Sequence, residues 1–185
     1  MPETEALSYV KVVPYDPNWA RSYAAERDRL IEVGGSLWLE LEHIGSTAVP
    51  GLFAKPIIDI MAAVQDLDEA QVLASRLNDL GYELIETEMR ARLFLRRRSK
   101  EDAQMYHLHI VEQSTWTMRN ERLMRDYLLA HPEAVSAYGD LKKRLAKELA
   151  DDSLAYTRAK TGFIQDLMDK ARTAIGLPPV DVWTD

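Results

Sequence analysis

The order of hydrophobic and polar residues changes character near Trp116. Before this residue, short segments with alternating or continuous hydrophobic residues predict β-strands, and two segments with hydrophobic residues at helical spacing lie among them. The predicted strands are residues 9–13, 37–44, 57–64, 82–85, 92–97 and 106–111. In residues 37–44 the alternation predicts that Trp38 points away from the leucines on either side of it.

After Trp116, hydrophobic residues recur at helical spacing and predict three helices, residues 119–130, 132–150 and 153–175. We expect these helices to supply packing and a lid rather than catalytic groups. The whole pattern predicts an α+β fold, with helices packed on a mixed β-sheet and a helical C-terminal region. We expect a single domain over residues 1–185, made of an α/β core (9–115) and C-terminal helices (116–175).

Composition narrows the class of protein. The 185 residues include 23 Lys and Arg against 30 Asp and Glu, a net charge of −7, which argues against a general nucleic-acid-binding surface. The chain has no cysteine, which excludes disulfides and thiolate metal sites. The first residues lack the features of a signal peptide, and no hydrophobic stretch is long enough for a membrane span. We expect a cytoplasmic protein with no membrane partner, and the sequence predicts no particular oligomeric state.

The tripeptide Gly45-Ser46-Thr47 directly follows a predicted strand. A glycine lets the backbone approach a ligand closely, and exposed N–H groups with two hydroxyls suit a phosphate group. The alternative is a tight turn in which Ser46 begins a short helix.

Asp59 lies inside the otherwise hydrophobic strand 57–64. A buried carboxylate needs a cation or hydrogen-bond donors, so Asp59 is either a structural ion-pair partner or a candidate site residue. His107 and His109 are two residues apart on a strand and therefore lie on the same face, where they suit a metal ion or a phosphate. His43 ends the strand before Gly45, and we expect it to join these two histidines around Asp59.

A basic cluster follows the second predicted helix, and its members are Arg90, Arg92, Arg96, Arg97, Arg98 and Lys100. Arg92, Arg96 and Arg98 would share a strand face and could bind a phosphorylated ligand. The alternative is an edge strand that is protected by charge. Lys55 and Lys160 are further candidates for phosphate or nucleotide binding.

Four segments in a fixed order resemble the GrpB family: VVPYDPNWARSYAAERDRL, HIGSTAVPGLFAKPIIDI, YHLHIV and RDYLLAHPEAVSAYGDLKKRLA. The resemblance covers residues 12–168, and the family resembles the nucleotidyltransferase superfamily with its polymerase-beta-like fold. In that superfamily a Gly-Ser pair binds nucleotide phosphates, and two acids on one strand plus a third on a later strand hold two divalent metals. The resemblance implies that Gly45 and Ser46 bind phosphate and that Asp59 is the first acid.

The chain departs from this pattern at the other two acids. Met61 stands at the second acid, and the strand expected to carry the third offers His107 and His109. Such residues suit a single Zn²⁺, Mn²⁺ or similar ion better than two Mg²⁺ ions, or a metal-free site in which cationic side chains hold phosphate. A divalent metal (Mg, Mn or Zn) held by Asp59, His107, His109 and His43 is therefore one expectation.

Three functions fit these residues. The first is a transferase acting on a nucleotide or phosphorylated small molecule, with catalytic Asp59, His107 and His109. The second is a binding module that keeps the phosphate site without turnover, which Met61 favours. The third is a single-metal phosphoesterase that uses Asp59 and the histidines.

Overall fold

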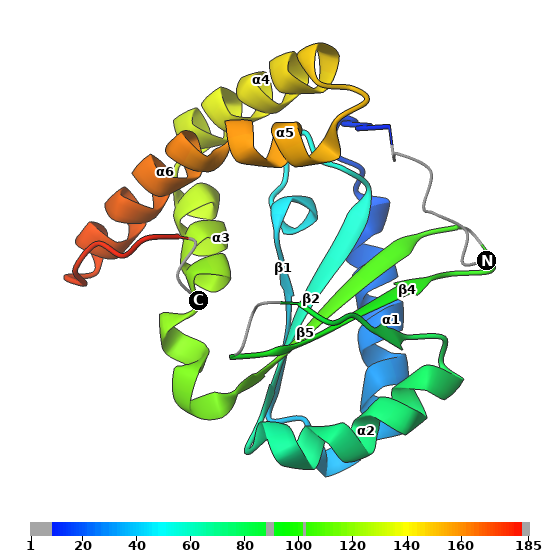
Figure 1. Ribbon diagram of the computed structural model, residues 1–185. Helices are drawn as coiled ribbons and strands as arrows, with labels where there is room; N and C mark the ends of the chain where they lie inside the picture. Colours follow the sequence, from blue (N-terminus) through cyan, green and yellow to red (C-terminus); the bar gives the residue numbers. More distant parts are fainter. Residues whose placement is uncertain (1–8, 88–90, 102, 183–185) are drawn as a thin grey trace.

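A five-stranded mixed sheet forms the centre of the computed structural model, which describes residues 9–87, 91–101 and 103–182 (Figure 1). β2 and β5 are parallel, and the other neighbouring strands are antiparallel. In order across the sheet, the strands are β1 (Glu40–Ile44), β2 (Ile57–Val64), β5 (Met105–Glu112), β4 (Leu93–Arg98) and β3 (Glu83–Leu84). The predicted α+β class with a mixed sheet is confirmed.

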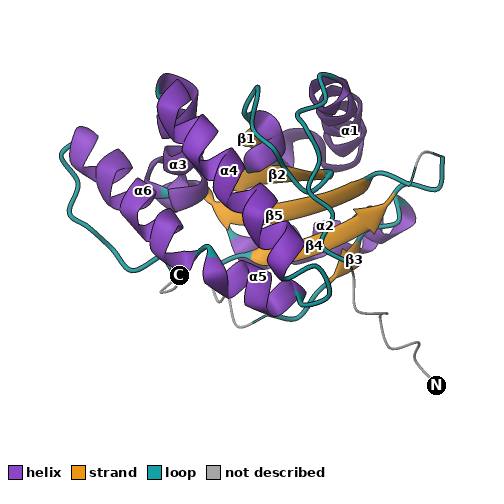
Figure 2. Ribbon diagram, turned by 90° about the horizontal axis from the view of Figure 1, so that it is seen from above, coloured by secondary structure: helices purple, strands orange, loops and turns teal. Residues whose placement is uncertain are grey.

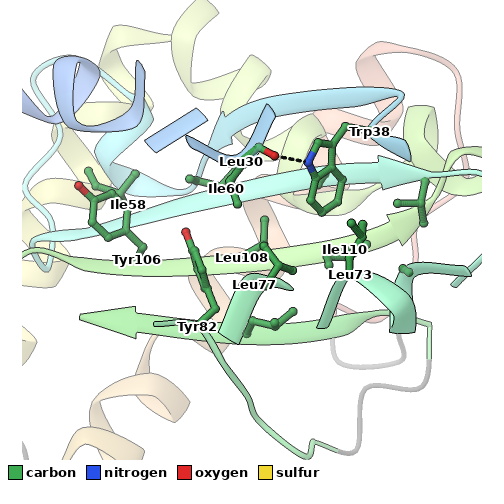
Figure 3. Close-up of a cluster of buried hydrophobic side chains, with 14 of the residues drawn as sticks. Leu30, Trp38, Ile58, Ile60, Leu73, Leu77, Tyr82, Tyr106, Leu108 and Ile110 are labelled. Carbon is green, nitrogen blue, oxygen red and sulfur yellow. Dashed lines mark hydrogen bonds between the residues drawn. The ribbon is translucent and has the colours of Figure 1, made fainter. Parts of the chain in front are cut away.

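One face of the sheet, here called the core face, is covered by α1 (Asn18–Gly34) and α2 (Leu67–Asp79). Alternate residues of the strands point into this layer because successive side chains of a strand face opposite sides. Figure 3 shows how Ile58 and Ile60 of β2 pack beside Leu108 and Ile110 of β5, and all four are fully buried. Burial of these hydrophobic side chains fixes which residues of each strand face the other side.

The C-terminal helices pack beyond the opposite face and over one end of the sheet (Figures 1 and 2). They are α3 (Asn120–Ala130), α4 (Pro132–Glu148), α5 (Ser153–Ala159) and α6 (Thr161–Ala174), and a 3₁₀ segment at Gln113–Met118 leads into them. Arg122 and Arg125 of α3 both donate to the carboxylate of Glu42 on β1, at 2.6 to 2.9 Å. These ion pairs attach the helical layer to the sheet. Among the described residues, no helix has the length and hydrophobicity that crossing a membrane requires.

Three predicted elements were wrong in part. Residues 9–13 form no strand: Val13 makes an isolated bridge with Ala54. The strand predicted from residue 37 begins at Glu40, because Gly35–Leu37 forms a 3₁₀ turn that directs Trp38 into the core, where its indole Nε1 donates to Leu30 O at 2.6 Å (Figure 3). The helix predicted over residues 153–175 is divided at Lys160 into α5 and α6.

Candidate functional site

The loop after β1 runs directly against the carboxylate of Asp59. Ile44, the last residue of β1, pairs with Asp59 of β2 in the antiparallel register. Gly45 follows with φ 71° and ψ −170°, a conformation that residues with a side chain rarely adopt. A Cβ at this position would lie 2.4 Å from Asp59 Oδ2. Glycine is therefore required for the loop backbone to approach the carboxylate.

Ser46 meets a buried lysine from the helical layer. Lys142 of α4 donates from Nζ to Ser46 Oγ at 2.5 Å and to the carbonyl of Phe53 at 3.1 Å, and it lies 4.1 Å from the ring centroid of Tyr138. Burial, together with the nearby charge of Lys160, holds the pKa of Lys142 well below its usual range, and Asp59 acts in the opposite direction. Burial thus disfavours the charged form of Lys142 at this position beside the loop.

Two further lysines approach the same region from other segments. Lys55 and Lys160 lie 4.8 and 4.4 Å from the ring centroid of Tyr156. Burial lowers the pKa of Lys160 to about 8, and Lys55 contributes in the same direction. Lys55, Lys142 and Lys160 are called the lysine cluster below. Within the described part of the chain, no carboxylate lies within ion-pair distance of any of the three.

Asp59, His107 and His109 form the other half of the site, on the face opposite the core face. Asp59 and His107 are paired in the parallel register of β2 and β5. His107 Nδ1 lies 3.2 Å from Asp59 Oδ1, and His109 Nε2 lies 4.0 Å from the same oxygen. The side chains of Asp59 and His107 remain 25% and 22% exposed, so a ligand can reach them.

His109 contacts an ion pair formed by Arg92 and Glu121. Arg92 Nη1 lies 3.3 Å from His109 Nδ1 and also donates to Glu121 of α3. Arg92 holds the pKa of Glu121 below its usual value, against the opposing effect of burial. Burial also lowers the pKa of His109 to about 4, so its ring is neutral near pH 7.

A small cavity opens between these groups and α3. It has a volume of about 190 Å³ and is lined by Gly45, Ser46, Asp59, Glu121, Met124, Arg125, Leu128 and Tyr138. The second carboxylate oxygen of Glu121 is buried and has no hydrogen-bond partner among the described residues. The cavity is smaller than a typical small-molecule pocket of roughly 300–1,000 Å³ and is suited to one group of a ligand.

The structure separates His43 from the other two histidines. His43 pairs with Ile60, so its side chain lies on the core face, where it stacks on Tyr23 with ring centroids 4.9 Å apart. Its Nε2 lies 3.0 Å from Thr47 Oγ1, and Thr47 donates to Ile57 O at 2.8 Å. His43 therefore does not join Asp59, and the buried hydroxyl of Thr47 holds the loop instead of facing the cavity.

The basic cluster is divided between the two faces of the sheet. Arg97 faces the core and donates to the buried carboxylate of Glu26 at 2.5 Å. Arg96 pairs in register with His107 and lines an open groove of about 700 Å³ at the β3 edge of the sheet. Arg90 lies outside the described residues. Arg92 of this cluster contacts a site histidine, with Nη1 3.3 Å from Nδ1 of His109.

Comparison with known proteins places the chain in a family. A family model described as GrpB protein matches residues 9–170. The chain belongs to the GrpB family. The UPF0157 protein SCO7215 of Streptomyces coelicolor is 33% identical over 170 residues, which cover 92% of this chain and 88% of that protein. The UPF0157 protein YqkA of Bacillus subtilis is 30% identical over 164 residues; these cover 88% of this chain, which spans only 47% of YqkA.

Solved structures extend the comparison to the fold. The crystal structure of the conserved protein GrpB from Enterococcus faecalis matches with a TM-score of 0.81 at 31% identity, covering 89% of this chain and 99% of that one. The GLD-2/RNP-8 complex matches with a TM-score of 0.57 at 16% identity, covering 80% of this chain and 51% of that one. The Cid1 poly(U) polymerase with bound MgGTP gives a TM-score of 0.51 at 17% identity, covering 74% and 44%. The predicted nucleotidyltransferase-type fold of this GrpB protein is confirmed.

The residues of this GrpB protein do not fit the two-metal site of the superfamily. Met61, where the resemblance places the second acid, is fully buried and packs against Ile44, Val111 and Trp116. A thioether is a poor ligand for Mg²⁺, which prefers oxygen. Within the described residues, no three His, Asp or Glu side chains are arranged to hold a metal ion.

Two functional candidates were missed by the sequence patterns. Lys142 lies one turn after Tyr138 on α4, beside the hydrophobic residues that pack this helix, and this i, i+4 spacing was the available signal. Glu121 is in the first turn of α3, where an acidic residue also has an ordinary role near a helix N-terminus. The neighbouring residues in sequence do not distinguish either position. Lys142 contacts Ser46 and Glu121 contacts Arg92, and both partners lie in segments distant in sequence.

Proposed function

We propose that this GrpB protein binds a nucleotide or another phosphorylated small molecule and transfers a phosphate-containing group. Phosphate groups would lie over Ser46 between the lysine cluster and Asp59. The cavity beside Ser46 would hold one adjoining group of the ligand. Arg96, across from His107 on the next strand, would add positive charge at the open side.

The observation that supports this proposal is the lysine cluster. Three lysine amino groups from three segments lie near one loop, and burial disfavours the charged form of each. Burying a cation without a carboxylate partner is costly, so a bound anion would favour the charged form of these lysines. A di- or triphosphate group carries the matching negative charge and accepts several hydrogen bonds.

Calorimetric titration of the 185-residue chain with ATP, GTP, CTP, UTP and inorganic pyrophosphate tests this proposal. We expect saturable binding of at least one of them, weakened about tenfold or more in Ser46→Ala and Lys142→Met, since a lost charge-assisted hydrogen bond is worth about 1.5–3 kcal/mol. Lys147→Met is the matched control, because Lys147 is an exposed residue of the same helix. No binding by any of the five compounds would contradict the proposal.

A second candidate is a binding module of the same fold that lacks turnover. Met61 favours this candidate, since a buried thioether replaces the second acid. Incubation with a labelled nucleotide and a panel of hydroxyl-bearing acceptors distinguishes the two functions. Release of pyrophosphate or labelling of an acceptor, lost in His107→Ala, supports a transferase; saturable binding without any product supports the binding module.

A further inference from the structure

The carboxylate of Asp59 is surrounded by hydrogen-bond donors and backbone. Oδ1 faces Nδ1 of His107 at 3.2 Å and Nε2 of His109 at 4.0 Å. Oδ2 faces the loop so closely that a single added carbon on Gly45 would lie 2.4 Å away. Each oxygen therefore lies close to a group of the protein, and the carboxylate remains 25% exposed.

The proton of His109 is fixed by its neighbour. Arg92 Nη1 lies 3.3 Å from His109 Nδ1, and a guanidinium group only donates hydrogen bonds. Nδ1 of His109 must therefore be the acceptor, which leaves the proton of the neutral ring on Nε2. That N–H lies beside the carboxylate of Asp59, 4.0 Å from Oδ1, which is beyond hydrogen-bond length. A metal ion at Nε2 would require the proton to move to Nδ1, directly against Arg92.

His107 has the opposite arrangement. Its Nδ1 lies at hydrogen-bond distance from Asp59 Oδ1, so the ring donates from Nδ1 to the carboxylate. The ring of Phe94 packs edge-on against His107 at 5.1 Å and an interplanar angle of 79°. Nε2 then carries the free lone pair of the ring. A carboxylate that orients a histidine in this way is the arrangement found in catalytic triads.

We propose that Asp59 and His107 are a proton-accepting pair that works without a metal ion bound to Asp59, and that His109 is a neutral hydrogen-bond donor beside it. This inference rests on the proposed function for its substrate. An acceptor hydroxyl gives its proton to His107 Nε2 while its oxygen forms a new P–O bond. The P–O bond to the leaving phosphate breaks, its electron pair leaves with that phosphate, and the lysine cluster neutralises the charge.

Nitrogen-15 NMR of the histidine rings tests the assignment without any substrate. The protein has four histidines. We expect the proton on Nδ1 in His107 and on Nε2 in His109. His131 is an internal reference for the first state, because its Nδ1 lies 2.7 Å from the carbonyl of Tyr127. His43 is the reference for the second state, since the Thr47 hydroxyl already donates to Ile57 and can only accept from His43 Nε2. A proton on Nδ1 of His109, or on Nε2 of His107, would overturn the proposal.

Metal titration supplies the second measurement. We expect Zn²⁺, Mn²⁺ and Mg²⁺ to leave the ring signals of His107 and His109 unchanged and to bind no more tightly to the parent than to Asp59→Asn. One equivalent of metal bound by the parent and lost in Asp59→Asn would overturn the proposal. His131→Ala is the control for metal binding at an unrelated histidine.

The two proposals fail in different ways. Absence of nucleotide and pyrophosphate binding contradicts the proposed function, while the ring protonation and metal results still decide the roles of Asp59 and the histidines. Where a nucleotide binds, we expect its affinity to change less than about threefold on addition of EDTA. A loss of binding in EDTA that is restored by Mg²⁺ would overturn metal independence and leave the proposed function intact.

Discussion

Asp59 Oδ2 occupies the space into which a side chain on Gly45 would project, 2.4 Å from the position of its Cβ. Gly45, which follows the last residue of β1, and Asp59, the third residue of β2, are therefore in close contact at the centre of the site. Gly45 has a positive φ that favours glycine. Both its backbone conformation and its close contact with Asp59 therefore require glycine at this position.

The substitution Gly45→Ala should destabilise the protein and displace Asp59. We expect a loss of about 3 kcal/mol or more in the free energy of unfolding, from backbone strain of about 1–3 kcal/mol plus the steric conflict. Urea denaturation measures it. Gly51→Ala is the matched control: Gly51 also has a positive φ (81°), but no atom lies within 4 Å of its added Cβ. Equal losses in the two variants would show that contact with Asp59 contributes nothing.

Met61 provides a test of the departure from the superfamily pattern. Asp at this position would bury a carboxylate among Ile44, Val111 and Trp116, opposite the carboxylate of Glu42 on β1. We expect Met61→Asp to cost about 3–5 kcal/mol and to create no Mg²⁺ site, whereas Met61→Leu costs less than about 1.5 kcal/mol. Thermal denaturation with and without Mg²⁺ measures both. A Mg²⁺-dependent rise in the melting temperature of Met61→Asp alone would contradict this prediction.

Local patterns predicted the parts of the fold that depend on neighbouring residues. The hydrophobic run at Ile57–Val64 and the proline that begins α4 gave correct element positions, because strand alternation and helix-start preferences are local effects. The 3₁₀ turn before Trp38 was not predicted, because the position of the indole depends on a hydrogen bond to the distant carbonyl of Leu30. A periodic pattern cannot indicate which distant carbonyl a side chain will find.

The sequence predicted part of the site correctly, and the residues it missed or misplaced depend on contacts between distant segments. Asp59 and His107 were singled out because polar residues interrupt hydrophobic strands, and they do lie together. His43 was misplaced because the register of β1 against β2 decides its face, and register depends on pairing across the sheet. Lys142 reaches Ser46 from 96 residues away. Its contact with the loop depends on how α4 packs against the sheet, which no local pattern indicates.

The contributions of Arg92 and Glu121 to the free energy of unfolding should be strongly coupled, because the two side chains form an ion pair. Arg92→Met leaves a largely buried carboxylate unpaired and should cost about 3 kcal/mol, while Arg92→Met/Glu121→Met should recover most of this loss. Denaturation of both single variants and the double variant measures the coupling. Lys143→Met tests an exposed pair, since Lys143 and Asp140 are 44% and 73% exposed, and should change stability by less than about 1 kcal/mol. Additive effects at Arg92 and Glu121 would contradict the prediction.

Removal of the Lys160 charge should stabilise the fold and weaken anion binding. The pKa of Lys160 is lowered to about 8 by burial and by Lys55, so the folded state disfavours its proton. Below that pH both the folded and unfolded states carry the proton, and the folded state bears the full cost. As the pH rises from 8 toward the ordinary lysine value, only the unfolded state stays protonated, so the stability of the parent rises.

We therefore expect Lys160→Met to be more stable than the parent by about 2 kcal/mol at neutral pH, with the difference shrinking above pH 8. Urea denaturation across this pH range measures the difference. Pyrophosphate affinity of the parent should fall as the pH rises through 8, because Lys160 loses its charge, and this part of the decline should be absent in Lys160→Met. Lys147→Met, at an exposed position of α4, should show neither effect. A Lys160→Met variant less stable than the parent at neutral pH would show that the contact of Lys160 with Tyr156 outweighs the cost of burying the charge.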